Sequence, residues 1–433
     1  MAPKRDIVVT GVGVVSSIGI GKEPFWAGLC TGRSGIRRLG TFDDPALPAP
    51  IGGEVADFDA KQYVRPRKSL KVMSRDIQLA FAAADLACVD AGLRERPIAP
   101  ERLGVIFGAA IIPGELDEMI GTYRNCMVDG QFDFCRWAPS AMAELFPLWM
   151  LKYLPNMPAC HIGIGQDARG PNNSITMGDV SSLSALIEAT RIIERGQADV
   201  MIAGGVGVGL HPIIWGRSEA GRVSWRRGDP AAASRPFDAE RDGRVNAEGA
   251  AALIVEPLAH AQARGAPIFA RLLGSAAAFE PGSIRSCNPT SNGRRDGAIR
   301  RAIVGAMRDA GLTPDELGCI VAHGTSSVED DRLEAQAIQS VLGDVPVTAP
   351  KGNFGYALAA SGALEAAVSV LACQHKLVPH TLNYEHPDPQ CPVNVVHGEP
   401  RPLGRPTAMV LTHSPHGQAV AVVLAAAPEN IVA

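Results

Sequence analysis

Residues 174–186 read S-I-T-M-G-D-V-S-S-L-S-A-L. A β-branched run enters a short turn at Gly178 and a run of helical character leaves it, which predicts a strand that passes directly into a helix. Asp179 stands at the apex of that turn. In open α/β sheets, reactive groups gather at the carboxyl ends of strands. The stretch therefore predicts an α/β fold, with a carboxylate where a nucleophile would be expected.

The succession of strand and helix continues on both sides of this turn. The predicted strands are 6–10, 103–112, 199–206, 247–256, 318–322, 393–397, 408–412 and 419–425. The predicted helices are 69–93, 180–195, 296–310, 331–342 and 360–375. Such alternation in both halves indicates a layered α/β fold with mostly parallel central sheets. No long Ser/Gly linker separates the halves, so we expect them to pack as one unit.

The composition places the chain in a broad class. Its 433 residues, 46% hydrophobic and 20% charged, fit a globular protein with a large core. The net charge of −4 gives no electrostatic reason to expect nucleic-acid binding. No apolar stretch approaches the length of a membrane span, and the apolar run near the N-terminus is too short for a signal peptide.

The cysteines and the first glycine-rich turn argue against metals and nucleotide cofactors. The nine cysteines are scattered with no C-x-x-C pair, so neither a zinc site nor a disulfide framework is expected, and a reducing cytoplasm fits. The turn G-V-G-V-V-S after the first strand lacks the third glycine of the dinucleotide fingerprint, because Ser16 stands there. We therefore expect no cofactor and no metal.

Two further polar sites resemble Asp179 in their apolar surroundings. His323 follows a predicted buried strand in V-A-H-G-T-S-S-V-E-D-D-R-L-E. Lys351 and Tyr356 precede an Ala/Gly-rich helix in A-P-K-G-N-F-G-Y-A-L-A-A-S-G. One such residue alone would more often be an ordinary loop side chain. Three sites in this order indicate a common functional site.

The order of motifs along nearly the whole chain resembles one family. The motifs are I-V-V-T-G-V-G-V-V-S-S-I-G, G-E-V-A-D-F-D, G-P-N-N-S-I, A-D-V-M-I-A-G-G, S-R-P-F-D-A-E-R-D-G, A-H-G-T-S-S, K-G-N-F-G-Y and L-N-Y-E-H-P-D-P. Together they resemble the β-ketoacyl-acyl-carrier-protein synthases of the elongating type, in the thiolase superfamily. The resemblance implies a five-layer αβαβα fold of two related halves, here 1–256 and 257–433, and usually a dimer.

The chemistry that the resemblance implies is a decarboxylative Claisen condensation. A cysteine at the strand-to-helix turn takes an acyl group from a carrier protein, and two histidines assist decarboxylation of a malonyl carrier and stabilise the oxyanion. A helix N-terminus suits this chemistry because it lowers a thiol pKa and offers backbone N–H groups to an oxyanion.

Carried over residue by residue, the family pattern is only partly present. His323 matches the first histidine, Lys351 matches the lysine of K-x-x-x-G-H, and Glu334 matches a carboxylate that orders this region. Tyr356 replaces the second histidine, and Asp179 replaces the cysteine. The family's G-F-G-G-T-N loop is replaced by T-H-S-P-H-G-Q-A at 412–419.

Two interpretations of Asp179 stay open at this point. As a structural residue it would cap the following helix, which is worth about 1 kcal/mol. As a chemical group it would act as a base or an unusual nucleophile. A carboxylate is a weak nucleophile toward thioesters and would give a labile anhydride, and Tyr356, with a reference pKa near 10, does not replace a histidine base.

Other segments carry weaker hypotheses. Cys160 is a possible substitute nucleophile, and His413 or His416 could replace the missing imidazole or be ordinary loop histidines. The segment 113–160, rich in aromatics and Met, would line a pocket, form a subunit contact or be core under a long loop. A basic run could meet an acidic carrier protein or be a solvated helix start. The run consists of Arg65, Arg67, Lys68 and Lys71.

Three functions follow from these interpretations. The first is a ketosynthase-like subunit of fatty-acyl or type II polyketide synthesis without condensing activity, paired like a chain-length factor with an active ketosynthase and visited by an acyl carrier protein. The second is a repurposed acyl-thioester enzyme, a hydrolase or acyltransferase, with Asp179 as base and His323 as oxyanion donor. The third is a non-catalytic homodimeric acyl-binding protein.

Overall fold

A computed structural model describes residues 6–40, 50–216, 222–226, 228–281 and 296–427. One of the nine cysteines, Cys287, lies outside the described residues. The centre of the fold is a mixed sheet of 12 strands. Its main strands are β1 (Ile7–Ser16), β5 (Leu103–Gly108), β8 (Asn172–Ile175), β9 (Val200–Val208), β10 (Glu248–Pro257), β11 (Ala270–Phe279), β12 (Cys319–Val321), β13 (Pro346–Thr348), β15 (Asn394–Val395), β17 (Thr407–His413) and β18 (Gln418–Ala426), with the short β2 (Gly19–Ile20) beside β1.

The strand order is β15-β13-β12-β17-β18-β11-β1-β10-β9-β5-β8. Two subsheets meet where β1 and β11 pair over three positions, from Ile7 opposite Leu272 to Val9 opposite Ala270. The strand pairs at both ends of this order are parallel. In the middle of the sheet, neighbouring strands are antiparallel along the stretch β9-β10-β1-β11-β18-β17. The prediction of mostly parallel sheets was therefore wrong, because strands such as β17 and β18 are joined by a short turn rather than by a helical crossover.

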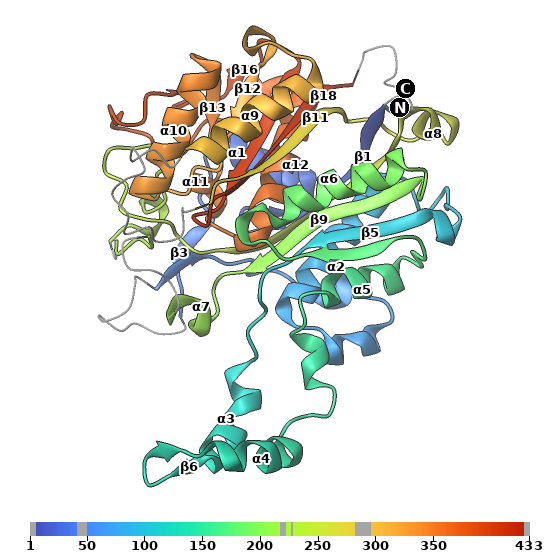
Figure 1. The fold of residues 1–433 in the computed structure, drawn as a ribbon, viewed down its shortest axis with the longest axis vertical. Helices are drawn as coiled ribbons and strands as arrows, with labels where there is room; N and C mark the ends of the chain where they lie inside the picture. The colour runs from blue at the N-terminus through green and yellow to red at the C-terminus, as the bar shows by residue number, and fades with distance from the viewer. Residues whose placement is uncertain (1–5, 41–49, 217–221, 227, 282–295, 428–433) are drawn as a thin grey trace.

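Helices form three layers around the two subsheets (Figure 1). Helices α2 (Arg75–Asp90) and α5 (Met157–Gly165) pack on the outer face of the first subsheet, and α9 (Gly297–Ala310) and α10 (Val328–Leu342) on that of the second. Helices α6 (Ser181–Glu194) and α12 (Ser361–His375) lie between the subsheets. Every residue of α12 from Ser361 to Cys373 is buried, as a helix between two sheets requires. The predicted five-layer αβαβα fold is confirmed; the division at 256/257 stays a prediction.

The predicted elements differ from the structure mainly in three places, and in the first two places glycine or alanine residues are the reason. β1 continues to Ser16 through the stretch expected to be a turn, because Gly11 and Gly13 let α2 approach: an added Cβ would lie 2.3 Å from Ala87 O and 1.9 Å from Ala83 O. The strand β11 was not predicted, since its sequence A-R-L-L-G-S-A-A-A-F lacks β-branched residues. The expected helix 69–93 is divided into a 3₁₀ turn at Arg67–Val72 and α2.

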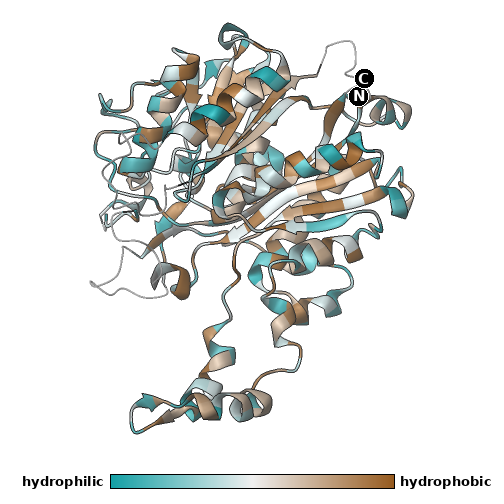
Figure 2. Ribbon diagram, viewed as in Figure 1, coloured by the Kyte–Doolittle hydropathy of each residue, from teal (hydrophilic) through white to brown (hydrophobic). Residues whose placement is uncertain are grey.

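Residues 113–156 form an arm that projects from the body (Figure 1). It contains α3 (Leu116–Asn125), the hairpin of β6 (Met127–Val128) and β7 (Gln131–Phe132), and α4 (Trp137–Glu144). Hydrophobic and hydrophilic stretches alternate on it (Figure 2), and Phe134 and Met142 are 81% and 87% exposed. The interpretation of this segment as ordinary core is therefore wrong for the arm. No helix in the described part of the chain is long and apolar enough to span a membrane.

A buried carboxyl group at the start of α2 gives the fold a pH dependence. Burial raises the pKa of Asp76 to about 7, and the nearby carboxylates of Glu248 and Glu115 add to the rise. An unfolded Asp titrates near pH 3.9, so between about pH 4 and pH 7 the folded protein keeps a proton that the unfolded chain has released. Stability therefore falls as the pH rises through this window, by at most about 4 kcal/mol.

We expect Asp76→Asn to remove most of this pH dependence, because the amide carries no titrating proton. Urea unfolding of both proteins at about pH 5 and pH 8 measures it. The wild type should lose stability between the two conditions and the variant should lose much less. Equal losses in the two proteins would show that another group titrates.

Candidate functional site

The turn that carries Asp179 joins β8 to α6. Gly178 has φ 63°, a left-handed conformation that suits glycine, and it begins a 3₁₀ turn, Gly178–Val180, that leads into the helix. The N-cap position of α6 is Val180, with no side-chain cap, while Ser181 Oγ donates to Gly178 O at 2.6 Å. The capping interpretation of Asp179 is therefore wrong, since its side chain turns elsewhere.

The Asp179 carboxyl group faces Tyr356. The Tyr356 hydroxyl donates a hydrogen bond to Asp179 Oδ1, and both side chains are buried. Burial raises the pKa of Asp179, although the Tyr356 hydrogen bond, Arg244, Lys351 and His413 act in the opposite direction. Burial also raises the pKa of Tyr356 well above its usual value, and the Asp179 carboxylate adds to this. The phenol therefore keeps its proton and remains the donor.

Arg244 completes this pair, although sequence reasoning did not single it out. Its guanidinium carbon lies 4.5 Å from the centroid of the Tyr356 ring, within range of a cation–π contact. The two residues are held close because Asn246 forms a β-bridge with Tyr356. Arg244 lies in the charged run A-E-R-D-G-R-V, and nothing in that run indicates that its side chain would contact Tyr356.

His323 is held in one tautomer by Lys351. The Lys351 ammonium lies 3.1 Å from His323 Nδ1 and also bonds His323 O and Glu365. Because an ammonium only donates, Nδ1 accepts, and the proton of the neutral ring is on Nε2. Burial lowers the pKa of His323 well below its usual value, and the Lys351 charge contributes. His323 is therefore a neutral imidazole with an Nε2–H donor.

Glu365, on α12, is a second residue that sequence reasoning missed. It is fully buried, and its carboxylate pairs with Lys351. Burial raises its pKa to about 8 against the opposing effect of Lys351. A lone carboxylate in the apolar helix S-G-A-L-E-A-A-V was the available signal, because a charge at a buried position needs a partner.

Glu334 and His413 complete the cluster. Glu334 accepts from the backbone N–H of His323 at 2.7 Å and from that of Gly324 at 2.8 Å, so it fixes the loop after β12. His413, at the end of β17, has its ring 4.9 Å from the His323 ring and its Nε2 3.7 Å from Glu334 Oε2. Burial lowers the pKa of His413, but Glu334, Asp330 and Asp179 outweigh burial and the net shift is upward.

The structure thus brings together most of the residues singled out from the sequence. The assembled residues are Asp179, His323, Glu334, Lys351, Tyr356 and His413. Two others are not part of the cluster: His416 is exposed, and Cys160 lies on α5, in the outer layer across the sheet from α6. Among the described residues, no cysteine joins the cluster.

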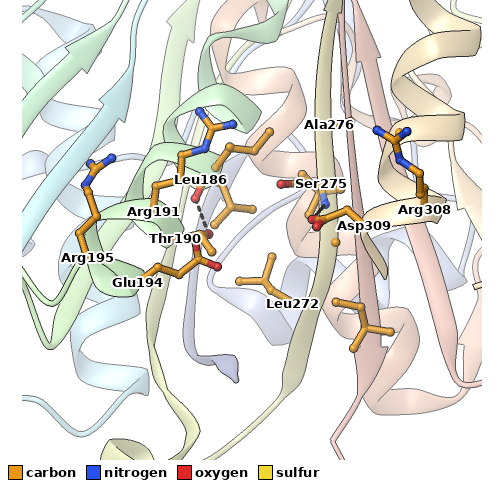
Figure 3. Close-up of a pocket in the computed structure, with 15 residues that line it drawn as sticks. Leu186, Thr190, Arg191, Glu194, Arg195, Leu272, Ser275, Ala276, Arg308 and Asp309 are labelled. Carbon is orange, nitrogen blue, oxygen red and sulfur yellow. Dashed lines mark hydrogen bonds between the residues drawn. The ribbon is translucent and has the colours of Figure 1, made fainter. Parts of the chain in front are cut away.

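A wide pocket lies elsewhere in the described structure. It measures about 870 Å³ and separates α6 from β11 and α9 (Figure 3). Arg191 and Arg195 lie on its α6 side, and Arg308 lies on its α9 side. None of the residues clustered around Asp179 lines it, so cavity size does not identify the site here. The buried ionisable cluster does, because shifted pKa values gather at functional sites.

A family model for the N-terminal domain of β-ketoacyl synthases matches residues 4–261, and one for the C-terminal domain matches 270–385. A 3-oxoacyl-[acyl-carrier-protein] synthase 2 from Synechocystis sp. is 36% identical over 405 residues, which is 92% of this chain and 93% of that protein.

Two solved structures have similar folds. The ishigamide ketosynthase/chain length factor superposes with a TM-score of 0.84 at 28% identity, covering 98% of this chain and 100% of that one. A type II polyketide acyl-carrier protein in complex with its ketosynthase bound to the hexaketide contains a chain that superposes with a TM-score of 0.82 at 29% identity, with the same coverage.

Proposed function

Because this chain belongs to the β-ketoacyl synthase family, we propose that it is a ketosynthase-like subunit of fatty-acyl or type II polyketide synthesis that does not condense acyl groups. In this proposal it pairs with an active ketosynthase, as a chain-length factor does, and helps to form the pocket for the growing chain. An acyl carrier protein visits the pair.

Asp179 at the turn before α6 is the observation that carries the proposal. Condensation in the family needs a thiol there, and the carboxyl group is instead bound by Tyr356. The position that would supply the second imidazole holds that same tyrosine. Two of the groups that the condensation requires are thus replaced by side chains that contact each other.

The arm and the free edge of β8 support the pairing. β8 ends the strand order, so within the described residues its outer edge has no partner strand, and such an edge is a template for pairing. The arm exposes large apolar side chains, which monomeric proteins rarely do over a wide surface. It also carries six acidic and three basic residues, which favours a neutral or basic protein surface over the acidic carrier protein or an anionic membrane.

The carrier protein fits a different surface. The four side chains of the basic run Arg65, Arg67, Lys68 and Lys71 are exposed around the 3₁₀ turn before α2. An acidic partner would be attracted to them at low salt, and this attraction would weaken as salt increases.

We expect this protein to co-elute with an active ketosynthase when the two are co-expressed, and an arm variant with Phe134→Lys and Met142→Lys to lose that partner. Two buried lysines would leave the apolar contact with unpaired charges, so binding should weaken by at least about 100-fold. Size-exclusion chromatography with mass determination measures it.

Val304→Lys is the matched control, since Val304 is an exposed valine on α9 at the opposite side of the fold. It should leave pairing unchanged. A homodimer that persists while no ketosynthase is captured would favour the acyl-binding homodimer instead. A stable complex with the doubly substituted arm would contradict the arm as the contact surface.

A further inference from the structure

Two imidazoles in the cluster are arranged as hydrogen-bond donors. Lys351 occupies His323 Nδ1, so the Nε2–H of His323 is left as its donor. The His413 ring lies against the His323 ring in an edge-to-face arrangement at 64°. His413 Nε2 makes no hydrogen bond within the described structure, although Glu334 Oε2 lies 3.7 Å from it. Both side chains are more than nine-tenths buried. Two such donors in a dry site stabilise an oxyanion far better than they would in water.

A base stands beside these donors. Tyr356 occupies only Oδ1 of Asp179, and no described residue makes a hydrogen bond to Oδ2. The Tyr356 ring also packs near His323, with ring centroids 6.4 Å apart. Tyr356 therefore contacts both the Asp179 carboxyl group and the His323 imidazole. A carboxylate with a free oxygen in a buried site is a better proton acceptor than one in water.

We propose that this site enolises acyl thioesters: Asp179 removes a proton from the carbon next to the thioester carbonyl, while His323 and His413 hold the developing oxyanion. The inference rests on the proposed function in one respect, since a carrier must deliver the acyl thioester to this subunit. It adds an activity that the proposed function lacks, because no carbon–carbon bond forms and no acyl-enzyme is needed.

The step balances without an oxidant or a second substrate. The Cα–H bond breaks and its proton goes to Asp179 Oδ2. The electron pair of that bond becomes a C=C bond, and the carbonyl π pair moves onto oxygen, where the Nε2–H of His323 and the His413 imidazole donate to it. The reverse transfer returns a proton to Cα, or to the γ carbon when the substrate carries a β,γ double bond, because the enolate is then a dienolate.

Exchange of deuterium into a simple thioester tests the inference. The full-length protein, alone and with its ketosynthase, is incubated in D₂O with butyryl-pantetheine, and mass spectrometry follows the gain of two mass units at Cα. The wild type should catalyse exchange. Asp179→Asn should slow it by at least about 100-fold, because a carboxamide does not accept the proton. His413→Ala should slow it by about 100-fold, the usual effect of losing an oxyanion donor.

Two further variants keep the test informative if Asp179→Asn fails to fold. His416→Ala, on the exposed side of the same loop, should leave exchange unchanged. Tyr356→Phe leaves the base in place but removes the hydrogen bond that lowers the Asp179 pKa. Its exchange should continue, with the pH profile displaced to higher pH. A merely structural role for these residues would not move that profile.

The outcomes separate this inference from the proposed function. No exchange by a protein that still pairs with its ketosynthase would overturn the inference and leave the pairing in place. Release of free butyrate without exchange would also overturn it, and would favour a thioester hydrolase. Exchange by a protein that captures no ketosynthase would support the inference and contradict the pairing.

Discussion

Asp179→Cys is expected to turn a protein that forms no acyl adduct into one that is largely acylated at residue 179. The variant places a thiol at the N-terminus of α6, where the helix dipole and the nearby Arg244 and His413 charges favour a thiolate. Thiolates attack thioesters readily, whereas the wild-type carboxylate is a weak nucleophile and is bound by Tyr356. We expect no detectable acyl adduct on the wild type, and an acyl adduct on most molecules of the Asp179→Cys variant.

Intact mass after exposure to an acyl-carrier substrate measures this effect. Cys160→Ser is combined with Asp179→Cys, so that an adduct on the half-buried thiol of α5 is not mistaken for one at the turn. Asp179→Ala is the matched control, since it removes the carboxyl group without adding a nucleophile. A stable adduct on the wild type would contradict the proposal that the subunit is non-condensing, and peptide mapping would locate the reactive residue.

Condensation is not expected to return with the thiol alone. In the proposed correspondence with the family, Tyr356 stands at the position of the second histidine, and a buried phenol whose pKa is raised does not act as an imidazole. Adding Tyr356→His tests whether the remaining scaffold is intact. Condensation by the single variant would show that His323 and His413 already suffice.

The local order of elements was predictable because short-range signals agree with the fold. Gly178 and the helix after it located the turn, and Gly196 after the last helical residues marked where α6 ends. The antiparallel middle of the sheet and the strand β11 were not predictable in this way. Both depend on which strands become neighbours, and the small residues of β11 make a strand only because α9 and β18 pack against it.

Most residues of the candidate site could be singled out from the sequence, but their contacts could not. Motif order located Asp179, His323, Lys351 and Tyr356, but it carried no information on which side chains meet. The contact between Asp179 and Tyr356 joins residues 177 positions apart, and the stacking of Arg244 on Tyr356 joins two loops. His413 was indistinguishable from His416 in the sequence, since only the end of β17 separates a buried ring from an exposed one.

Lys351→Met is expected to destabilise the folded protein by about 3–5 kcal/mol, a large share of the 5–15 kcal/mol that a typical domain possesses. Lys351 has no exposed surface, and its ammonium holds Glu365, His323 Nδ1 and His323 O together. Methionine fills a similar volume but leaves the Glu365 carboxyl buried with no cation. Glu365 Oε2 already lacks a hydrogen bond in the described structure, so no second partner is in place to compensate.

The double variant Lys351→Met with Glu365→Leu separates charge from packing. If the single variant is unstable because it leaves a buried carboxyl group unpaired, removing that group should recover at least about 2 kcal/mol. Urea unfolding midpoints at constant m-value measure both steps, and Lys71→Met, at an exposed position, should change stability by less than about 0.5 kcal/mol. A double variant less stable than the single one would show instead that the Glu365 carboxyl group is held by other contacts. In that case Lys351 would act mainly by fixing the His323 ring, and nitrogen NMR would show a change of the His323 tautomer in Lys351→Met.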